Sequence, residues 1–269
     1  EKHNEKAARK EIESNSMFTK AIVRTPGRSL TSGLTAAKLG TPVYQKALEQ
    51  HRQYIAALER CGLDVLILEA DEAFPDSTFV EDVAIVTPKC AIITRPAAAS
   101  RRGETAAMLP VLEDFYSYIE KIQPPGTLDG GDVMQVDQHF YIGLSSRTNR
   151  AGADQLIEIL QRYGMTGSTV PVTEVLHLKT GVTQVAEKTL LAAGEFIASA
   201  TFSDFRILPV PEEAKSGANC IRINGKLLLS TGFPEVSRQL VDQGAELIEV
   251  DISEYAKLDG GLTCLSLRF

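Results

Sequence analysis

The sequence has no tryptophan, few cysteines and histidines, and a shortage of positive charge. Its 269 residues include four cysteines and four histidines and carry a net charge of -7. Proteins that bind DNA or an anionic membrane surface need clustered positive charge, so this balance argues against both partners. No apolar run approaches the roughly 18 residues of a membrane-spanning helix, and the first residues lack the apolar segment of a signal peptide. We therefore expect a cytoplasmic protein without nucleic-acid or membrane partners.

The four cysteines are too scattered for a familiar metal or disulfide framework. They stand at positions 61, 90, 220 and 264, without the close pairs of a zinc site or the density of a disulfide-rich domain. The sequence therefore predicts free thiols.

Residues 1–16 differ in composition from the rest of the chain. The stretch EKHNEKAARKEIESNS is mostly charged or polar, whereas Met17 opens the apolar run MFTKAIV. We interpret 1–16 as an upstream extension or cloning remnant with a frayed backbone. With 43% hydrophobic residues overall and no long linker, residues 17–269 are expected to form a single domain.

One pattern recurs along the chain in loose form. An apolar strand is followed by a polar turn, a second strand, a loop with Arg or Ser, and an amphipathic helix. Clear copies occupy 82–115, 132–164 and 219–250, and weaker ones open at Ala21 and Leu190. Such units predict an α/β fold with helices outside the strands, and a radial arrangement of about five units would protect the sheet edges.

Two local signals inside these copies are specific enough to locate elements. Asn224-Gly225 is a strong hairpin signal between two apolar strands. The first weak copy predicts a helix over 42–61 and a strand over 64–68.

Cys264 differs from the other cysteines in its surroundings. Cys61 ends a predicted helix, and Cys90 and Cys220 lie in apolar strands, so all three are expected in the core. Cys264 follows DGGLT, where two glycines allow a tight turn whose backbone N–H groups can hold a thiolate or a developing anion. The pattern fits either a nucleophile or a small residue in a terminal strand.

His177 is the histidine whose surroundings suit catalysis. His3 stands in the polar N-terminal stretch, His51 on the predicted surface of a helix, and His139 at a hairpin turn. His177 is flanked by leucines in EVLHLKTG, at a predicted strand end before a glycine turn. It fits a general acid or base, or a core histidine with satisfied hydrogen bonds. Cys264 and His177 therefore form a testable pair.

Carboxylates gather in two segments that precede predicted strands. FPDSTFVEDVAIV contains Asp76, Glu81 and Asp82 among aromatic and branched residues, and PPGTLDGGDVM places Asp129 and Asp132 beside glycines. Asp76 also fits a turn cap, and Asp132 also fits a bond to the loop backbone. If several of these acids converge, the site suits a cation with many donors, such as a guanidinium.

Arginines occur in loops after equivalent second strands. Arg101 and Arg102 lie in the loop of the first clear copy, and Arg147 lies in the loop of the second. Each fits either a ligand for a carboxylate or a solvated surface arginine.

Six ordered motifs give the chain a family resemblance. They are FPDSTFVED, AIITRPAAASRRGE, LDGGDV, YIGLSSRTN, LHLKTG and DGGLTCLSLRF. Together, from Met17 to Phe269, the chain resembles dimethylarginine dimethylaminohydrolase, of the guanidine-modifying pentein superfamily. The resemblance implies a five-bladed α/β-propeller of ββαβ units with the active site on its central axis. It also implies hydrolysis of N-omega-methylated arginine to citrulline and methylamine or dimethylamine, without a metal or organic cofactor.

The resemblance also implies roles for individual residues. Cys264 aligns with the nucleophile that forms a covalent S-alkylthiouronium, and His177 aligns with the general acid/base. Asp129 aligns with the carboxylate that orients the histidine and contacts the guanidinium, although some relatives have Glu at this position. The residues that align with other substrate contacts are Asp82 for the guanidinium, Arg101 and Arg147 for the carboxylate, Asp76 and the backbone of Leu34 for the α-amino group, and Phe79 and Glu81 in the pocket lining.

Other functions share parts of this pattern. Arginine deiminases act on unmethylated arginine, but they are typically longer and carry an added helical domain; amidinotransferases are longer too and need an amine acceptor. A propeller that binds arginine-like ligands without turnover is the non-enzymatic alternative. Because binding alone does not need a thiol, the combination of Cys264, His177 and Asp129 favours an enzyme. The expected partner is a small guanidine amino acid, and the family suggests a homodimer.

Overall fold

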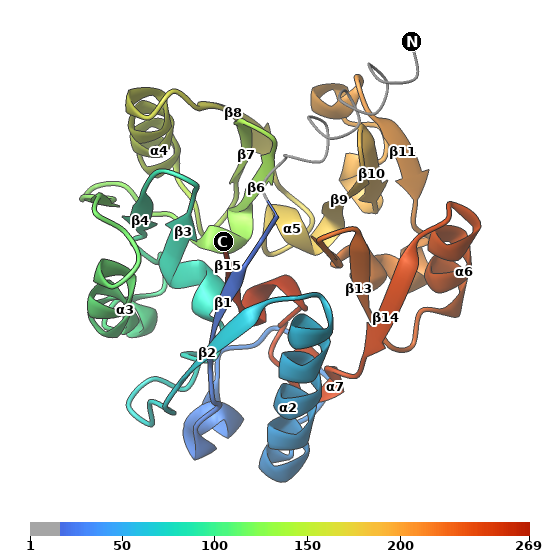
Figure 1. Cartoon of the computed structure of the whole chain (residues 1–269), viewed down its shortest axis with the longest axis horizontal. Helices are drawn as coiled ribbons and strands as arrows, with labels where there is room; N and C mark the ends of the chain where they lie inside the picture. The colour runs from blue at the N-terminus through green and yellow to red at the C-terminus, as the bar shows by residue number, and fades with distance from the viewer. Residues whose placement is uncertain (1–16) are drawn as a thin grey trace, which may run out of the picture.

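The computed structural model describes residues 17–269, and the predicted extension at 1–16 lies outside the described residues. The described chain forms five three-stranded sheets arranged around a common centre (Figure 1). Their strand orders are β15-β1-β2, β3-β4-β5, β6-β7-β8, β9-β10-β11 and β12-β13-β14. We call these sheets blades 1 to 5, in that order.

The strands and longer helices are short, and they divide among the blades as follows. Blade 1 contains β1 (Lys20–Arg24), β2 (Asp64–Leu68), β15 (Leu267–Arg268) and helix α2 (Tyr44–Arg60). Blade 2 contains β3 (Ala84–Val86), β4 (Ala91–Ile93), β5 (Ile119–Lys121) and α3 (Glu104–Glu113). Blade 3 contains β6 (Val133–Val136), β7 (His139–Leu144), β8 (Thr166–Pro171) and α4 (Arg150–Arg162). Blade 4 contains β9 (Val182–Ala186), β10 (Thr189–Ala192) and β11 (Arg206–Pro209), and blade 5 contains β12 (Ile221–Ile223), β13 (Lys226–Ser230), β14 (Glu246–Val250) and α6 (Pro234–Asp242).

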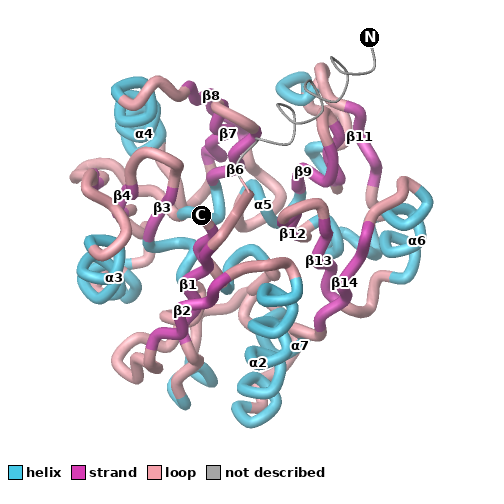
Figure 2. The backbone as a smooth tube through the Cα atoms, in the orientation of Figure 1, coloured by secondary structure: helices cyan, strands magenta, loops and turns pink. Residues whose placement is uncertain are grey.

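All five blades share one topology. The middle strand of each sheet is antiparallel to one neighbour and parallel to the other. Parallel neighbours need a crossover connection, and helices α2, α3, α4 and α6 provide it on the outside of the ring (Figure 2). The predicted five-bladed α/β-propeller of ββαβ units is confirmed.

The local sequence signals located their elements closely. The helix expected over 42–61 forms as α2, and the strand expected over 64–68 forms as β2. Asn224 and Gly225 both have positive φ, 48° and 85°, as a two-residue hairpin between β12 and β13 requires.

Blade 4 departs from the recurring pattern, because its crossover contains no α-helix. Residues between β10 and β11 form two short 3-10 helices, η5 (Gly194–Phe196) and η6 (Ala200–Phe202). Phe196 and Phe202 each bury their rings, so two aromatic side chains fill the space that an apolar helix face fills elsewhere. The blade therefore keeps its topology with a different covering layer.

His51 is not on the surface of its helix, and that prediction is wrong. It is 3% exposed on the inner face of α2, one turn from the buried residues Ala47 and Tyr54. Residues three or four apart share a helix face, so the apolar positions determine where His51 points. Within residues 17–269, none of the helices is both long and apolar enough to cross a membrane.

The hydrophobic core is divided among the seams between neighbouring blades. One cluster, for example, combines Ala21 of blade 1 with Ile221 of blade 5, and another combines Ile22 of blade 1 with Ala84 of blade 2. The remaining clusters join blades 2 and 3, 3 and 4, and 4 and 5. Each blade therefore depends on both neighbours for its burial.

A short helical turn precedes the first strand of each blade at the centre of the ring. These inner turns are η2 (Val80–Val83), η4 (Gly130–Asp132), α5 (Leu178–Gly181), η7 (Glu212–Ala218) and η8 (Thr263–Leu265). Four neighbouring pairs among them are in contact: η8 with η2, η2 with η4, η4 with α5, and α5 with η7. The topology therefore brings five segments that are distant in sequence to one point.

Candidate active site

The inner turns carry most of the residues that the sequence singled out. Glu81 and Asp82 lie within η2, Asp129 caps the start of η4, His177 caps the start of α5, and Cys264 lies within η8. One oxygen or nitrogen atom from each of Asp82, Asp129 and His177 lies within 4.8 Å of the other two. The predicted convergence of acids and histidine at the ring centre is therefore observed.

His177 and Asp129 form a buried hydrogen-bonded pair. The imidazole Nε2 lies 3.2 Å from Oδ2 of Asp129, and the other carboxylate oxygen accepts a hydrogen bond from the backbone N–H of Ala97. Burial alone would lower the pKa of His177, but the charge of Asp82, the bond to Asp129 and the charge of Asp132 raise it to about 9. The imidazole is therefore protonated at neutral pH and can act as an acid.

Asp132 holds the backbone on which His177 sits. Its carboxylate accepts hydrogen bonds from the hydroxyls of Ser145 and Thr148, at 2.6 and 2.7 Å, and from the N–H of Leu178 at 3.0 Å. A side chain at Gly131 would lie 2.7 Å from the imidazole Nδ1, so the glycine lets the ring pack against the backbone. The sequence alternative gave Asp132 a bond to its own loop backbone, but the backbone N–H that it accepts from is that of Leu178 on α5.

Asp82 is a buried carboxylate with two fixed partners. Its Oδ2 accepts a hydrogen bond from Nη1 of Arg101 at 2.5 Å, and its Oδ1 accepts one from the N–H of Gly131 at 3.0 Å. Burial would raise the pKa of Asp82, but the charges of His177 and Arg101 lower it. Asp82 is therefore ionised and faces the histidine. The cluster of Asp82, Asp129 and His177 does not suit a metal ion, because Asp82 is already bonded to Arg101 and a protonated imidazole has no free lone pair for a metal.

Arg101 is oriented by groups of the protein itself. Its guanidinium bonds both oxygens of Glu104 as well as Asp82, and its Nη2 donates to the carbonyls of Asp76 and Phe79. Glu104 is 4% exposed, and its pKa is raised to about 7 by burial, against the opposing effect of Arg101. Removing one partner of such a buried pair leaves an unpaired charge and costs about 3–5 kcal/mol.

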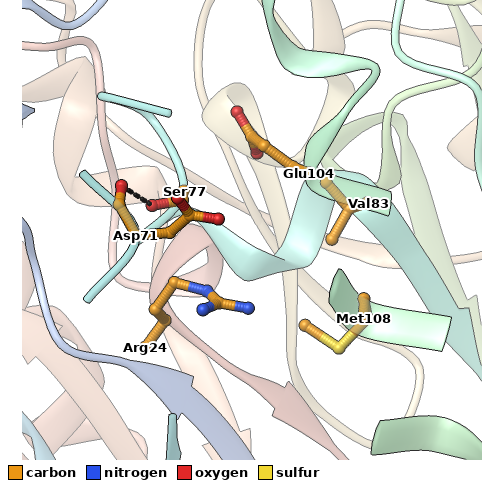
Figure 3. A pocket seen from close by; sticks show the side chains of 6 residues that line it. All are labelled: Arg24, Asp71, Ser77, Val83, Glu104 and Met108. Atoms are coloured by element: carbon orange, nitrogen blue, oxygen red, sulfur yellow. Dashed lines mark hydrogen bonds between the residues drawn. The ribbon is translucent and has the colours of Figure 1, made fainter. Parts of the chain in front are cut away.

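A small cavity lies beside Glu104 (Figure 3). It is lined by Arg24, Asp71, Ser77, Val83, Glu104 and Met108, so none of the three predicted catalytic residues borders it. Glu104 both lines this cavity and bonds Arg101, so the cavity borders the Arg101 ion pair and not the predicted catalytic residues.

Asp76 and Arg147 mark the region where the α-amino and carboxylate ends of a substrate were expected. The carboxylate of Asp76 accepts a hydrogen bond from the N–H of Leu34 at 3.0 Å, and Leu34 itself is exposed. Burial raises the pKa of Asp76, and the nearby charges of Arg101 and Arg147 oppose this effect. Two cations therefore lie close to the Asp76 and Leu34 pair.

Cys264 is the one partly exposed residue among the four cysteines, all of which are free and three of which are buried. Burial of its sulfur, followed by the charges of Glu81 and Asp82, raises the pKa of the thiol to about 12. The N–H of Cys264 donates to the carbonyl of Gly261 at 3.3 Å. A cation placed between the thiol and these carboxylates would lower the thiol pKa.

Glu81 is paired on one oxygen only. Its Oε1 accepts hydrogen bonds from Lys179 at 2.6 Å and from Arg268 at 3.3 Å. Its Oε2 is buried and has no hydrogen-bond partner in the described part of the chain. Phe79, the other predicted lining residue, is buried and packs edge-to-face against Tyr255.

The chain matches a family model over most of its length. Residues 37–266 match the model described as N,N dimethylarginine dimethylhydrolase, eukaryotic. It is 51% identical to the N(G),N(G)-dimethylarginine dimethylaminohydrolase of Pseudomonas aeruginosa, over 94% of this chain and 100% of the relative. The chain belongs to the dimethylarginine dimethylaminohydrolase family. The enzyme of the same name from Streptomyces coelicolor is 40% identical, over 93% of this chain and 96% of that one.

Solved structures of the dimethylarginine dimethylaminohydrolase family share the fold. A cysteine-to-serine mutant of the Pseudomonas aeruginosa enzyme, complexed with citrulline, superposes with a TM-score of 0.93 at 50% identity, covering 94% of this chain and all of that one. The N-terminal domain of ArgZ, an arginine dihydrolase, has a TM-score of 0.83 at 15% identity, covering 94% of this chain and 97% of that one. The second likeness shows the fold alone.

Sequence reasoning singled out the dimethylarginine dimethylaminohydrolase motifs but missed several residues that hold the site in place. Glu104 and Lys179 were present in the quoted motifs RRGE and LHLKTG, and Arg268 stands in the last motif, but none of them was given a role. Glu104 stands three residues after Arg101, a spacing that favours a local pair and was overlooked. Lys179 and Arg268 both bond Glu81, which lies on the inner turn of another blade, so only the tertiary structure could identify these two pairs.

Proposed function

We propose that this protein hydrolyses N-omega-methylated arginine to citrulline and methylamine or dimethylamine. The convergence of Asp82, Asp129 and His177 within 4.8 Å, beside the turn that carries Cys264, is the observation that supports the proposal most strongly. The chain's family membership and the citrulline complex of its Pseudomonas aeruginosa relative support the same reaction.

Two carboxylates bind the substrate guanidinium. A guanidinium is a poor electrophile because resonance spreads its charge, so catalysis depends on holding its central carbon against the sulfur. Asp82 and Asp129 supply acceptors for its N–H groups, which is the pairing that carboxylates and guanidinium groups prefer. Asp76, the backbone of Leu34, Arg147 and Arg101 receive the amino-acid end, a role that for Arg101 stays a prediction because its guanidinium already bonds Asp82 and Glu104.

The first half of the reaction forms a covalent intermediate. The positive charge of the bound substrate offsets Glu81 and Asp82 and lowers the pKa of the Cys264 thiol from about 12. The thiol proton passes to solvent, the thiolate attacks the guanidinium carbon to form a C–S bond, and His177 donates its proton to the leaving amine as the C–N bond breaks. An S-alkylthiouronium remains on Cys264.

The second half of the reaction regenerates the thiolate. The now neutral His177, oriented by Asp129, takes a proton from water as its oxygen attacks the same carbon. The C–S bond then breaks, the sulfur leaves as thiolate, and citrulline departs. The ureido oxygen of citrulline therefore comes from water, and the step consumes no cofactor.

The test is a product assay with matched variants. Purified protein is incubated with asymmetric dimethylarginine and, in parallel, with arginine, and citrulline is measured for the wild type, Cys264→Ser and the buried control Cys61→Ala. We expect citrulline from the methylated substrate in the wild type and in Cys61→Ala, and none in Cys264→Ser.

Other outcomes would contradict this assignment in distinct ways. Turnover of arginine alone would indicate a deiminase-type hydrolase, and turnover surviving in Cys264→Ser would exclude this residue as the nucleophile. No citrulline from either substrate would favour a non-catalytic binder of arginine-like ligands. The homodimer and the cytoplasmic location stay predictions, which gel filtration and cell fractionation would test.

A further inference from the structure

The proposed nucleophile and acid sit on inner turns that no continuous element joins. Cys264 lies on η8, which leads into blade 1, and His177 caps α5, which leads into blade 4. Between these turns in the ring lies η7, the inner turn of blade 5, which contributes none of the residues assigned so far. Side-chain contacts across η7 therefore join the two turns on one side of the ring, as the bonds of Glu81 to Lys179 and Arg268 do through η2 on the other.

Asn219, the residue that caps the end of η7, makes those contacts. Its Nδ2 donates to the carbonyl of Lys179 on α5 at 2.8 Å and to the hydroxyl of Thr263 on η8 at 3.0 Å. Its Oδ1 accepts a hydrogen bond from the N–H of Thr263 at 3.2 Å. Lys179 stands two residues after His177, and Thr263 immediately precedes Cys264. One side chain thus connects the two segments.

The surroundings of Asn219 restrict its position. The residue is 6% exposed, and its own N–H donates to the carbonyl of Ser216 within η7. A side chain at Gly261 would overlap the Asn219 carboxamide, so this glycine of the DGGLT motif leaves the space that the carboxamide occupies. Both N–H groups and the carbonyl oxygen of the carboxamide are satisfied, which fixes the orientation of the amide as well as its location.

We propose that Asn219 is a positioning residue that sets Cys264 opposite His177. It acts through the backbone of Thr263 and Lys179, and the role rests on the proposed hydrolysis. Proton donation to the leaving amine requires the acid to reach the nitrogen while sulfur is bonded to the same carbon, so loss of alignment lowers kcat. The predicted substrate contacts Asp76, Asp82 and Leu34 lie on blades 1 and 2, so KM depends on them and not on Asn219.

The first experiment compares steady-state kinetics of the wild type, Asn219→Ala and the control Asn224→Gly with asymmetric dimethylarginine. Asn224 also bridges blades, donating to the carbonyls of Phe18 and Cys61, but at the hairpin of blade 5, and glycine tolerates its positive φ. We expect kcat to fall about a hundredfold in Asn219→Ala with KM within about threefold. Both variants should lose thermal stability, whereas Asn224→Gly should keep its kcat.

A second readout separates misalignment from general damage. Iodide leaves from iodoacetamide without needing a proton, so alkylation of Cys264 should proceed at a similar rate in the wild type and Asn219→Ala. An unchanged kcat in Asn219→Ala would overturn the proposal, and so would a parallel loss of kcat and alkylation with a similar loss in Asn224→Gly. If Asn219→Ala does not fold, Thr263→Val removes one of the three bonds and should lower kcat by a smaller factor with KM unchanged.

Crystal structures of the same variants test the inference without turnover. We expect η8 to shift relative to α5 in Asn219→Ala and to stay in place in Asn224→Gly. Superposable inner turns in Asn219→Ala would overturn the positioning role. If the wild type produces no citrulline, the proposed function fails, and the crystal comparison still decides whether Asn219 sets the distance between sulfur and imidazole.

Discussion

The thiol of Cys264 stands in an environment that opposes its ionisation until a cation arrives. Burial raises the pKa of the thiol, the charges of Glu81 and Asp82 raise it further, and the backbone bond at Gly261 and the charge of Lys179 only partly offset them. Asp82 also stabilises the imidazolium of His177, together with Asp129 and Asp132. The resting site is therefore suited to binding a cation before it activates a nucleophile.

Alkylation kinetics would test this view of Cys264. Below the thiol pKa of about 12, the thiolate fraction rises tenfold per pH unit, so the rate with neutral 2-chloroacetamide should rise steadily from neutral pH upward. Cationic 2-chloroacetamidine, which carries the same leaving group, should react at least about tenfold faster at neutral pH because its charge offsets Asp82 and lowers the thiol pKa. Asp82→Asn should reduce this advantage. Equal rates for the two reagents, measured by mass mapping of Cys264, would contradict the account.

The residues of the site were predictable to different degrees. Cys264 and His177 stood out because each has neighbours unlike those of its fellow cysteines or histidines. The place of Asp132 beside glycines suggested a bond to its own loop, but its bond to the backbone of Leu178 on α5 did not follow from the sequence. The bond between Arg101 and Asp82 did not follow, because the two residues stand 19 positions apart and their distance depends on the tertiary structure. Glu104 stands only three positions after Arg101, and this local pair was overlooked.

At the scale of elements, periodic patterns predicted more than single polar residues did. Helix α2 and strand β2 formed where the pattern indicated, and the hairpin at Asn224 needed only its two turn residues. The prediction for His51 failed because it was based on residue type, whereas the helix period places this histidine inward. In blade 4, two phenylalanines on 3-10 helices take the place of the expected α-helix, and no periodic pattern in the sequence predicts this arrangement.

The buried His51 predicts a loss of stability in acid. Burial lowers its pKa from 6.5 to about 4 in the folded state, so only the unfolded chain binds a proton as the pH falls from 6.5. Because of this residue, the free energy of unfolding should fall by about 3 kcal/mol between about pH 7 and pH 4. Its Nε2 has no hydrogen-bond partner among residues 17–269, so His51→Leu should fold.

Urea unfolding at both pH values would measure the effect. The difference in unfolding free energy between His51→Leu and the wild type should shift in favour of the variant on acidification. An identical pH dependence in the two proteins would show that His51 titrates normally.

At the scale of the molecule, the ring is closed by two strands from opposite ends of the sequence. Strand β15 pairs antiparallel with β1, matching Ala21 with Arg268 and Ile22 with Leu267. Leu267 is 4% exposed and belongs to the cluster between blades 1 and 2. Because every cluster is shared by two blades, a substitution that destabilises one seam should lower the stability of the whole ring.

Leu267→Ala should therefore destabilise the whole molecule. Truncating a buried leucine costs about 2–5 kcal/mol, and the shared clusters predict that unfolding remains a single transition. Leu39→Ala, at a leucine that is 62% exposed, should change the stability by less than about 0.5 kcal/mol. Circular dichroism and fluorescence in urea would measure both. Two separated transitions in Leu267→Ala would show that the blades fold independently.

The pairing of β15 with β1 also orders events during synthesis. A growing chain on the ribosome can assemble blades 2 to 5 in succession, but blade 1 stays two-stranded until β15 leaves the exit tunnel. Cys264 stands just before β15, so the proposed nucleophile reaches Glu81 and Asp82 in the same event that adds the last strand of blade 1. A chain without β15 therefore holds no assembled reaction centre, and activity would report that blade 1 is closed.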